Sequence, residues 1–152
     1  MQGTAMRVSV IGTGYVGLVT GVVFAERGHD VCCVDADAAK VAMLREGRPT
    51  IYEPGLEPLL RKHTAAGRLR FTQSVAEGVA HGEVVFIAVG TPPDAEGAAD
   101  LSQIEAVARE IAQALREYRV VVEKSTVPVE TGERVARTIA KFAPAGVPFD
   151  VV

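Results

Sequence analysis

The chain of 152 residues contains no tryptophan, only two cysteines and only three histidines. No two histidines have the spacing of metal ligands, so the sequence predicts no metal site. No apolar run reaches the roughly 18 residues that a membrane-spanning helix needs. No cluster of lysine or arginine marks a surface for nucleic acid or acidic lipid, and the net charge is -3. Nucleic acids and membranes are therefore not expected as partners.

The start of the sequence lacks both the basic and the apolar region of a secretion signal. We interpret residues 1–5 as a tag or leader, and residues 6–152 as one domain. Two cysteines without an export signal favour a cytoplasmic location with both thiols reduced. No GxSxG, P-loop or Ser/His/Asp pattern is present, which argues against the common hydrolase and P-loop chemistries.

Six short apolar runs rich in β-branched residues alternate with segments of helical periodicity. Continuous runs of this kind are typical of strands buried on both faces of a parallel sheet. They span residues 8–11, 31–34, 69–71, 84–89, 120–122 and 149–152. The pattern predicts an α/β fold of the Rossmann type, with a doubly wound, mostly parallel six-stranded sheet in the order 3-2-1-4-5-6.

Several residues mark expected helix ends. Ser74 with Glu77, and Ser102 with Glu105, have the spacing of capping boxes at two helix starts. Three glycines stand where helices should stop, namely Gly28, Gly47 and Gly67. The last two enclose an extra helix before strand 3, and the local sequence leaves open whether this segment is functional or surface decoration.

The first strand runs directly into the sequence GTGYVG, which places Gly12, Gly14 and Gly17 in a G-x-G-x-x-G pattern. Gly12 is expected to make a tight turn, Gly14 to let the backbone approach a pyrophosphate, and Gly17 to let helix and strand pack closely. A helix that begins near Tyr15 would direct its free amide groups at that phosphate. The pattern predicts a dinucleotide site.

Asp35 follows Gly12 by 23 positions, at the end of the second strand. A carboxylate near this spacing accepts hydrogen bonds from the adenosine ribose and repels the 2′-phosphate of NADP, which favours NAD. We interpret Asp37 as the cap of the next helix. Lys40 either reaches the ribose or a phosphate, or lies on a solvated helix face.

Polar residues also follow the fourth and fifth strands. Thr91 comes shortly after one, and Ser125 and Thr126 come after the other. Ligands of open α/β sheets bind beyond the carboxyl ends of the strands. The glycine loop, Asp35 and these residues are therefore expected to converge on one crevice, although each could instead serve only as a turn or cap residue.

Cys32 and Cys33 lie within the second strand, so their side chains point to opposite faces. The sequence places no histidine, lysine or helix N-terminus near them to lower a thiol pKa, and His81 is expected on a loop. We interpret both cysteines as small buried hydrophobic residues rather than as a reactive site.

Four segments together closely resemble the NAD-binding domain of the UDP-glucose/GDP-mannose dehydrogenase family. They are VIGTGYVGLVTG, VDADAAKVAMLREGRPTIYEPGLEPLL, VGTPPDAEGAADLSQIEAVA and EKSTVPVETG. The tyrosine after the second glycine and the Tyr-Glu-Pro-Gly insertion are diagnostic of this group, and the resemblance covers residues 6–152. Glu130 departs from it, because the family commonly has glycine there.

The resemblance implies roles for individual residues. Tyr15 and Val16 would line the pyrophosphate with the glycine loop, and Asp35 and Lys40 would hold the adenosine ribose. Thr91 would approach the centre of the cofactor. Thr126 would lie near the nicotinamide and help to position the catalytic water, which makes it the one catalytic residue implied for this chain.

The resemblance also implies an enzyme that oxidises the C6 alcohol of a nucleotide sugar, UDP-glucose to UDP-glucuronate, with two NAD⁺, for polysaccharide biosynthesis. GDP-mannose or a UDP-N-acetylsugar is the alternative substrate, and a stand-alone nucleotide-binding module is the alternative function. The family's nucleophilic cysteine, its central helix and its substrate domain would follow Val152. We therefore expect a chain that binds NAD without catalysis, cut from a parent that is a homodimer or larger.

Overall fold

The computed structural model describes residues 3–152, so the predicted leader over residues 1–5 lies partly outside the described residues. Its centre is a six-stranded sheet in the order β3-β2-β1-β4-β5-β6, and every pair of neighbouring strands is parallel. The predicted fold class and strand order are confirmed. The strands are β1 Arg7–Ile11, β2 Asp30–Val34, β3 Leu69–Thr72, β4 Val84–Ile87, β5 Arg119–Glu123 and β6 Phe149–Val151.

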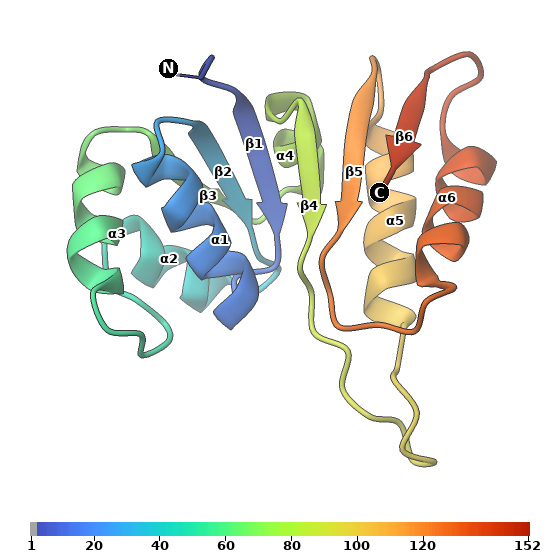
Figure 1. Ribbon diagram of the computed structural model, residues 1–152, viewed down its shortest axis with the longest axis horizontal. Helices are drawn as coiled ribbons and strands as arrows, with labels where there is room; N and C mark the ends of the chain where they lie inside the picture. The colour runs from blue at the N-terminus through green and yellow to red at the C-terminus, as the bar shows by residue number, and fades with distance from the viewer. Residues whose placement is uncertain (1–2) are drawn as a thin grey trace.

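Six helices cover the two faces of the sheet. They are α1 Tyr15–Glu26, α2 Ala38–Arg45, α3 Leu56–Ala65, α4 Val75–His81, α5 Ser102–Ala114 and α6 Thr131–Phe142. Helices α1, α2 and α3 pack on one face around a core that includes Leu18, Leu44 and Leu60. Helices α4, α5 and α6 pack on the other face, around a core that includes Ile111 and Ile139 (Figure 1). This is the doubly wound arrangement in which both faces of a parallel sheet are buried.

The two predicted capping boxes turn out differently. Ser74 caps α4, because its hydroxyl accepts from the Glu77 amide at 3.2 Å, but the Glu77 carboxylate accepts from the Thr72 hydroxyl at 2.6 Å instead of returning to Ser74. The second box was a wrong prediction. Ser102 is already the first residue of α5, and its amide donates to the Asp100 carboxylate at 2.9 Å. The Asp100 carboxylate thus accepts from the Ser102 amide, which in a capping box would donate to the Glu105 side chain.

Helix α3, which belongs to the extra segment before β3, is part of the core. Leu56 and Leu60 are buried beside α1. His63, only 2% exposed, lies 2.5 Å from the Glu26 carboxylate at the end of α1. Hydrogen bonds from His63 and Lys62 hold the pKa of Glu26 below its usual value. The segment is therefore not mere surface decoration, since its helix covers part of α1.

The turn between β1 and α1 requires glycine at two positions for different reasons. Gly12 has a φ of 103°, a conformation that side-chain-bearing residues rarely adopt. A Cβ atom on Gly17 would lie 1.8 Å from the carbonyl oxygen of Gly12. By contrast, nothing lies within 4 Å of a Cβ atom built on Gly14. Gly12 and Gly17 are therefore required by the fold itself, whereas Gly14 leaves open space in front of the helix.

This difference predicts opposite outcomes for two alanine substitutions. Gly17→Ala should lower the free energy of unfolding by about 3 kcal/mol, because the added methyl group pushes α1 away from backbone atoms that cannot move aside. Gly14→Ala is the matched control. Its free energy of unfolding should stay within about 1 kcal/mol of that of the unsubstituted chain. Urea denaturation followed by circular dichroism measures both, and equal stability of the two variants would contradict the packing role of Gly17.

Candidate functional site

A cavity of about 780 Å³ opens at the carboxyl ends of the central strands. Its wall contains all but one of the predicted site residues, which come from four separate segments of the chain: Gly12, Gly14, Tyr15, Val16, Asp35, Lys40, Thr91 and Thr126. The exception is Gly17, which is buried under the β1–α1 turn and does not line the cavity. The predicted convergence of the strand ends on one crevice is therefore observed.

Asp35 lies at the tip of β2, where three hydrogen bonds hold its carboxylate. Its Oδ2 accepts from the backbone amide of Thr13 at 3.1 Å and from the Thr13 hydroxyl at 2.6 Å. Its Oδ1 accepts from the amide of Asp37 at 2.9 Å. Partial burial acts to raise the pKa of Asp35. These hydrogen bonds and the nearby charge of Lys40 outweigh that effect, so the pKa lies below its usual value. The site therefore presents a fixed negative charge.

Asp37 caps helix α2, as its position predicted. Its Oδ1 accepts from the amides of Ala39 and Lys40, at 2.9 and 3.2 Å. The side chain of Lys40, one turn along this helix, lines the cavity. Whether Lys40 contacts a ribose or a phosphate stays a prediction.

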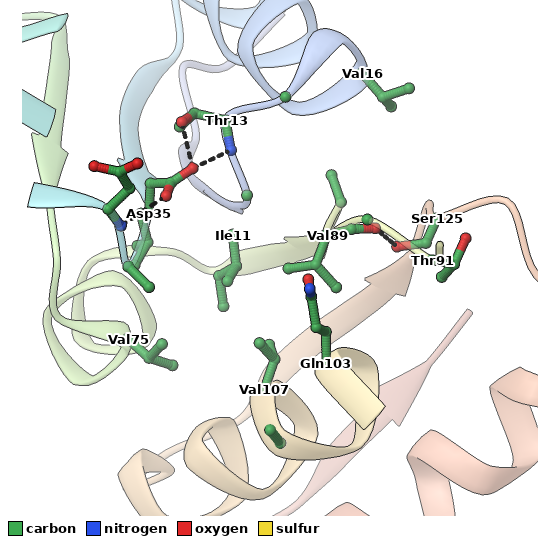
Figure 2. Close-up of a pocket in the computed structure, with 18 of the residues that line it drawn as sticks. Ile11, Thr13, Val16, Asp35, Val75, Val89, Thr91, Gln103, Val107 and Ser125 are labelled. Atoms are coloured by element: carbon green, nitrogen blue, oxygen red, sulfur yellow. Dashed lines mark hydrogen bonds between the residues drawn. The ribbon is translucent and has the colours of Figure 1, made fainter. Parts of the chain in front are cut away.

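The opposite side of the cavity is held by two hydroxyl groups that join the loops after β4 and β5. The Thr91 hydroxyl donates to the carbonyl oxygen of Thr126 at 2.9 Å. The Ser125 hydroxyl donates to the carbonyl oxygen of Val89 at 2.9 Å. Figure 2 shows Thr91 and Ser125 across the cavity from Thr13 and Asp35. These two hydrogen bonds hold the loops after β4 and β5 at a fixed separation, and both are made to backbone carbonyl oxygens of these loops.

Helix α1 starts in the wall of this cavity with no side chain to cap it. Gly14 is its N-cap and makes no side-chain bond, in contrast to α2 and α4, which Asp37 and Ser74 cap. Amide groups at such a start are free to bind an anion, and the helix dipole favours negative charge there. Tyr15 and Val16, about half exposed, flank this start. The uncapped start of α1 and the Asp35 carboxylate therefore belong to the wall of the same cavity.

Several residues of the cavity wall were missed by the sequence motifs. Val75 at the start of α4 and Val107 on α5 supply an apolar wall near Asp35, with Gln103 beside them (Figure 2). Thr13, the variable residue of the G-x-G turn, contacts Asp35 directly. Val107 is one of several apolar residues of α5, and no motif in the sequence indicated that this part of α5 lines the cavity.

A cavity with an apolar wall, the Asp35 carboxylate and an uncapped helix start is an arrangement that fits a dinucleotide. Residues 6–152 match the model of the UDP-glucose/GDP-mannose dehydrogenase family, NAD binding domain. The chain belongs to this family. The matching part of the family is its NAD-binding domain. The prediction of NAD as the cofactor is therefore confirmed at the level of the family.

Individual members of the family agree with this assignment. A UDP-glucose 6-dehydrogenase from Pseudomonas aeruginosa is 58% identical over 134 residues, 88% of this chain and 30% of the relative. The structure of a UDP-glucose dehydrogenase from Pyrobaculum islandicum superposes with a TM-score of 0.93 at 47% identity, over 97% of this chain and 35% of the other. The structure of a GDP-mannose dehydrogenase ternary complex from Pseudomonas aeruginosa superposes with a TM-score of 0.91 at 41% identity. The match covers 96% of this chain and 35% of the other. The chain thus spans about a third of the length of these relatives.

Glu130, the residue that departs from the family pattern, causes no strain in this NAD-binding domain. It precedes α6 with a φ of -78° and a ψ of -2°, which is ordinary right-handed geometry. Glycine is therefore not needed at this turn. Among residues 3–152, no group of histidine, cysteine and acidic side chains could hold a metal ion, and no helix is long and apolar enough to cross a membrane.

The cysteines of this NAD-binding domain are buried and lie outside the cavity wall. The expectation that His81 lies on a loop was wrong. His81 is the last residue of α4 rather than part of a loop, and it lines a second cavity, of about 240 Å³, with Cys32 and Arg70. Burial nevertheless raises the pKa of Cys32 to about 11, and burial also raises that of Cys33.

Both thiols should therefore resist modification in the folded chain. At about pH 7.5 a thiol whose pKa is near 11 is almost entirely protonated, and the thiolate is the reactive form. We expect Ellman's reagent to leave the native chain unlabelled and to react with both cysteines in guanidinium chloride. Fast labelling of the native chain would contradict this assignment.

Proposed function

We propose that this domain binds NAD⁺ with the adenosine ribose at Asp35 and the pyrophosphate at the uncapped start of α1. The adenine would lie between Val75 and Val107, and Lys40 would support the ribose side. The nicotinamide side would reach toward Thr91 and Thr126. The observation that carries this proposal is the fixed, ionised carboxylate of Asp35 in the wall of a cavity that also contains the helix start.

The first test compares the two nicotinamide dinucleotides by calorimetry on the 152-residue chain. NAD⁺ should bind at least tenfold more tightly than NADP⁺, because a 2′-phosphate would face the Asp35 charge. Asp35→Asn should weaken NAD⁺ binding and reduce this preference. Asp30→Asn, at the opposite end of the same strand, is the matched control for the loss of one carboxylate. Tighter binding of NADP⁺ to the unsubstituted chain would refute the role of Asp35.

We further propose that the whole protein is an NAD-dependent nucleotide-sugar dehydrogenase that converts UDP-glucose to UDP-glucuronate with two NAD⁺. When bound, NAD⁺ supplies the hydride acceptor. The support is the higher identity to the enzyme named for UDP-glucose than to the one named for GDP-mannose. GDP-mannose and UDP-N-acetylsugars are the alternative substrates. The whole protein would be a homodimer or larger assembly in the cytoplasm. Its product would be used in polysaccharide biosynthesis.

The substrate is tested on the complete protein by measuring NADH formation with each nucleotide sugar. The value of kcat/KM should be highest for UDP-glucose, and light scattering should report at least a dimer. A higher value for GDP-mannose or a UDP-N-acetylsugar would transfer the assignment to that sugar while leaving the cofactor site unaffected.

The 152-residue chain itself should bind NAD⁺ without oxidising sugar. Both of its cysteines are buried away from the cavity, so neither can capture the aldehyde that the proposed oxidation forms first. Incubation of the pure chain with UDP-glucose and NAD⁺ should leave the absorbance at about 340 nm unchanged. Steady NADH formation would contradict the view that this domain only binds the cofactor.

A further inference from the structure

Thr13 stands out as a buried polar side chain in a loop that otherwise consists of glycine. It is 1% exposed, and it lies between Gly12 and Gly14 at the rim of the cavity. Its hydroxyl and its amide both donate to the same oxygen, Oδ2 of Asp35, at 2.6 and 3.1 Å. Figure 2 shows both bonds as dashed lines between the two residues. The hydroxyl therefore has one visible partner, and that partner is the carboxylate of the cofactor site.

The bonds to Asp35 occupy most of its capacity to accept hydrogen bonds. An ionised carboxylate offers about four acceptor positions, two on each oxygen. Thr13 fills both positions on Oδ2, and the Asp37 amide fills one on Oδ1 at 2.9 Å. One position on Oδ1 is left for a ligand hydroxyl. Rotation of the carboxylate would break the Thr13 bonds, so the free position is fixed in direction.

The same contacts connect the two loops that a dinucleotide would bridge. Thr13 belongs to the turn that leads into α1, and Asp35 belongs to the turn that leads into α2. Asp37, which holds the other oxygen of Asp35, also caps α2 through the amides of Ala39 and Lys40. The carboxylate is thus ordered before any ligand arrives, which removes part of the entropic cost of binding.

We propose that Thr13 is a positioning residue for nucleotide recognition: its hydroxyl locks the Asp35 carboxylate so that one Oδ1 acceptor position serves a ribose hydroxyl and the charge opposes a 2′-phosphate. This inference rests on the proposed binding of NAD⁺ at Asp35. Thr13 acts through Asp35 and has no role in the chemistry of hydride transfer.

The electrostatics of the site support this role. Partial burial acts to raise the pKa of Asp35, and the hydrogen bond from the Thr13 side chain is the largest influence that lowers it. Loss of that hydroxyl leaves the cost of burial less well opposed. The carboxylate should then both turn more freely and take up a proton at a higher pH.

Two substitutions of Thr13 distinguish the effect of its hydroxyl from the effect of its side-chain shape. Thr13→Val keeps the branched shape but removes the hydroxyl, and Thr13→Ser keeps the hydroxyl. Thr20→Val, on α1 outside the cavity wall, is the matched control for the same chemical change. Thr13→Ala replaces the valine variant if circular dichroism shows that the latter does not fold.

The expected results are a raised Asp35 pKa and weaker NAD⁺ binding in Thr13→Val. Carbon-13 NMR of the carboxyl group, assigned with Asp35→Asn, measures the pKa, and calorimetry measures both dinucleotides. The dissociation constant for NAD⁺ should rise roughly tenfold, as for loss of a hydrogen bond to a charged group, and the preference over NADP⁺ should narrow. Thr13→Ser should restore the pKa and the affinity.

The outcomes distinguish this inference from the function on which it rests. An unchanged Asp35 pKa and unchanged affinities in Thr13→Val would overturn the positioning role, and so would equal losses in the valine and serine variants, which would indicate packing alone. If the unsubstituted chain does not bind NAD⁺, or if Asp35→Asn binds it equally well, the proposed function itself fails.

Discussion

The close approach of helix α1 to the end of β1 is the constraint on which the rest of this structure depends. The backbone of Gly17 lies so near the Gly12 carbonyl that no side chain fits between them. This contact places the uncapped start of α1 directly beyond the sheet, beside the ends of β2 and β4. A helix held farther away would leave its free amide groups outside the cavity. The contact between Gly12 and Gly17 therefore sets both the packing of α1 and the position of its amide groups at the site.

The cavity is then shaped by hydrogen bonds between loops rather than by the loops individually. Thr13 and Asp35 join the first two loops, and Thr91 joins the fourth strand's loop to Thr126. Each bond uses a short hydroxyl side chain, which orders the loop without filling the space between the two sides. The result is a preformed site in which the Asp35 carboxylate supplies a fixed charge on one side.

The extra helix α3 shows how an insertion can become part of the framework. It packs against α1 through buried leucines, and His63 pairs with Glu26 at the far end of α1 from the cavity. Helix α1 is therefore held at its start by the glycine contact and at its end by α3. The insertion stabilises the helix whose N-terminus faces the site.

The sequence by itself determined the α/β class, the strand order, the glycine turn and the Asp35 position, because these depend on local periodicity, on backbone freedom and on spacing along the chain. It indicated the family through the resemblance of four segments to known members. It could not supply the partners of side chains that meet only in space. Asp100 rather than Glu105 accepts from the Ser102 amide, Cys32 and His81 line the same small cavity, and Thr13 donates two hydrogen bonds to Asp35. These contacts join residues of different loops and elements, and only the packing of the sheet and helices decides which of the competing donors and acceptors come within reach of each other.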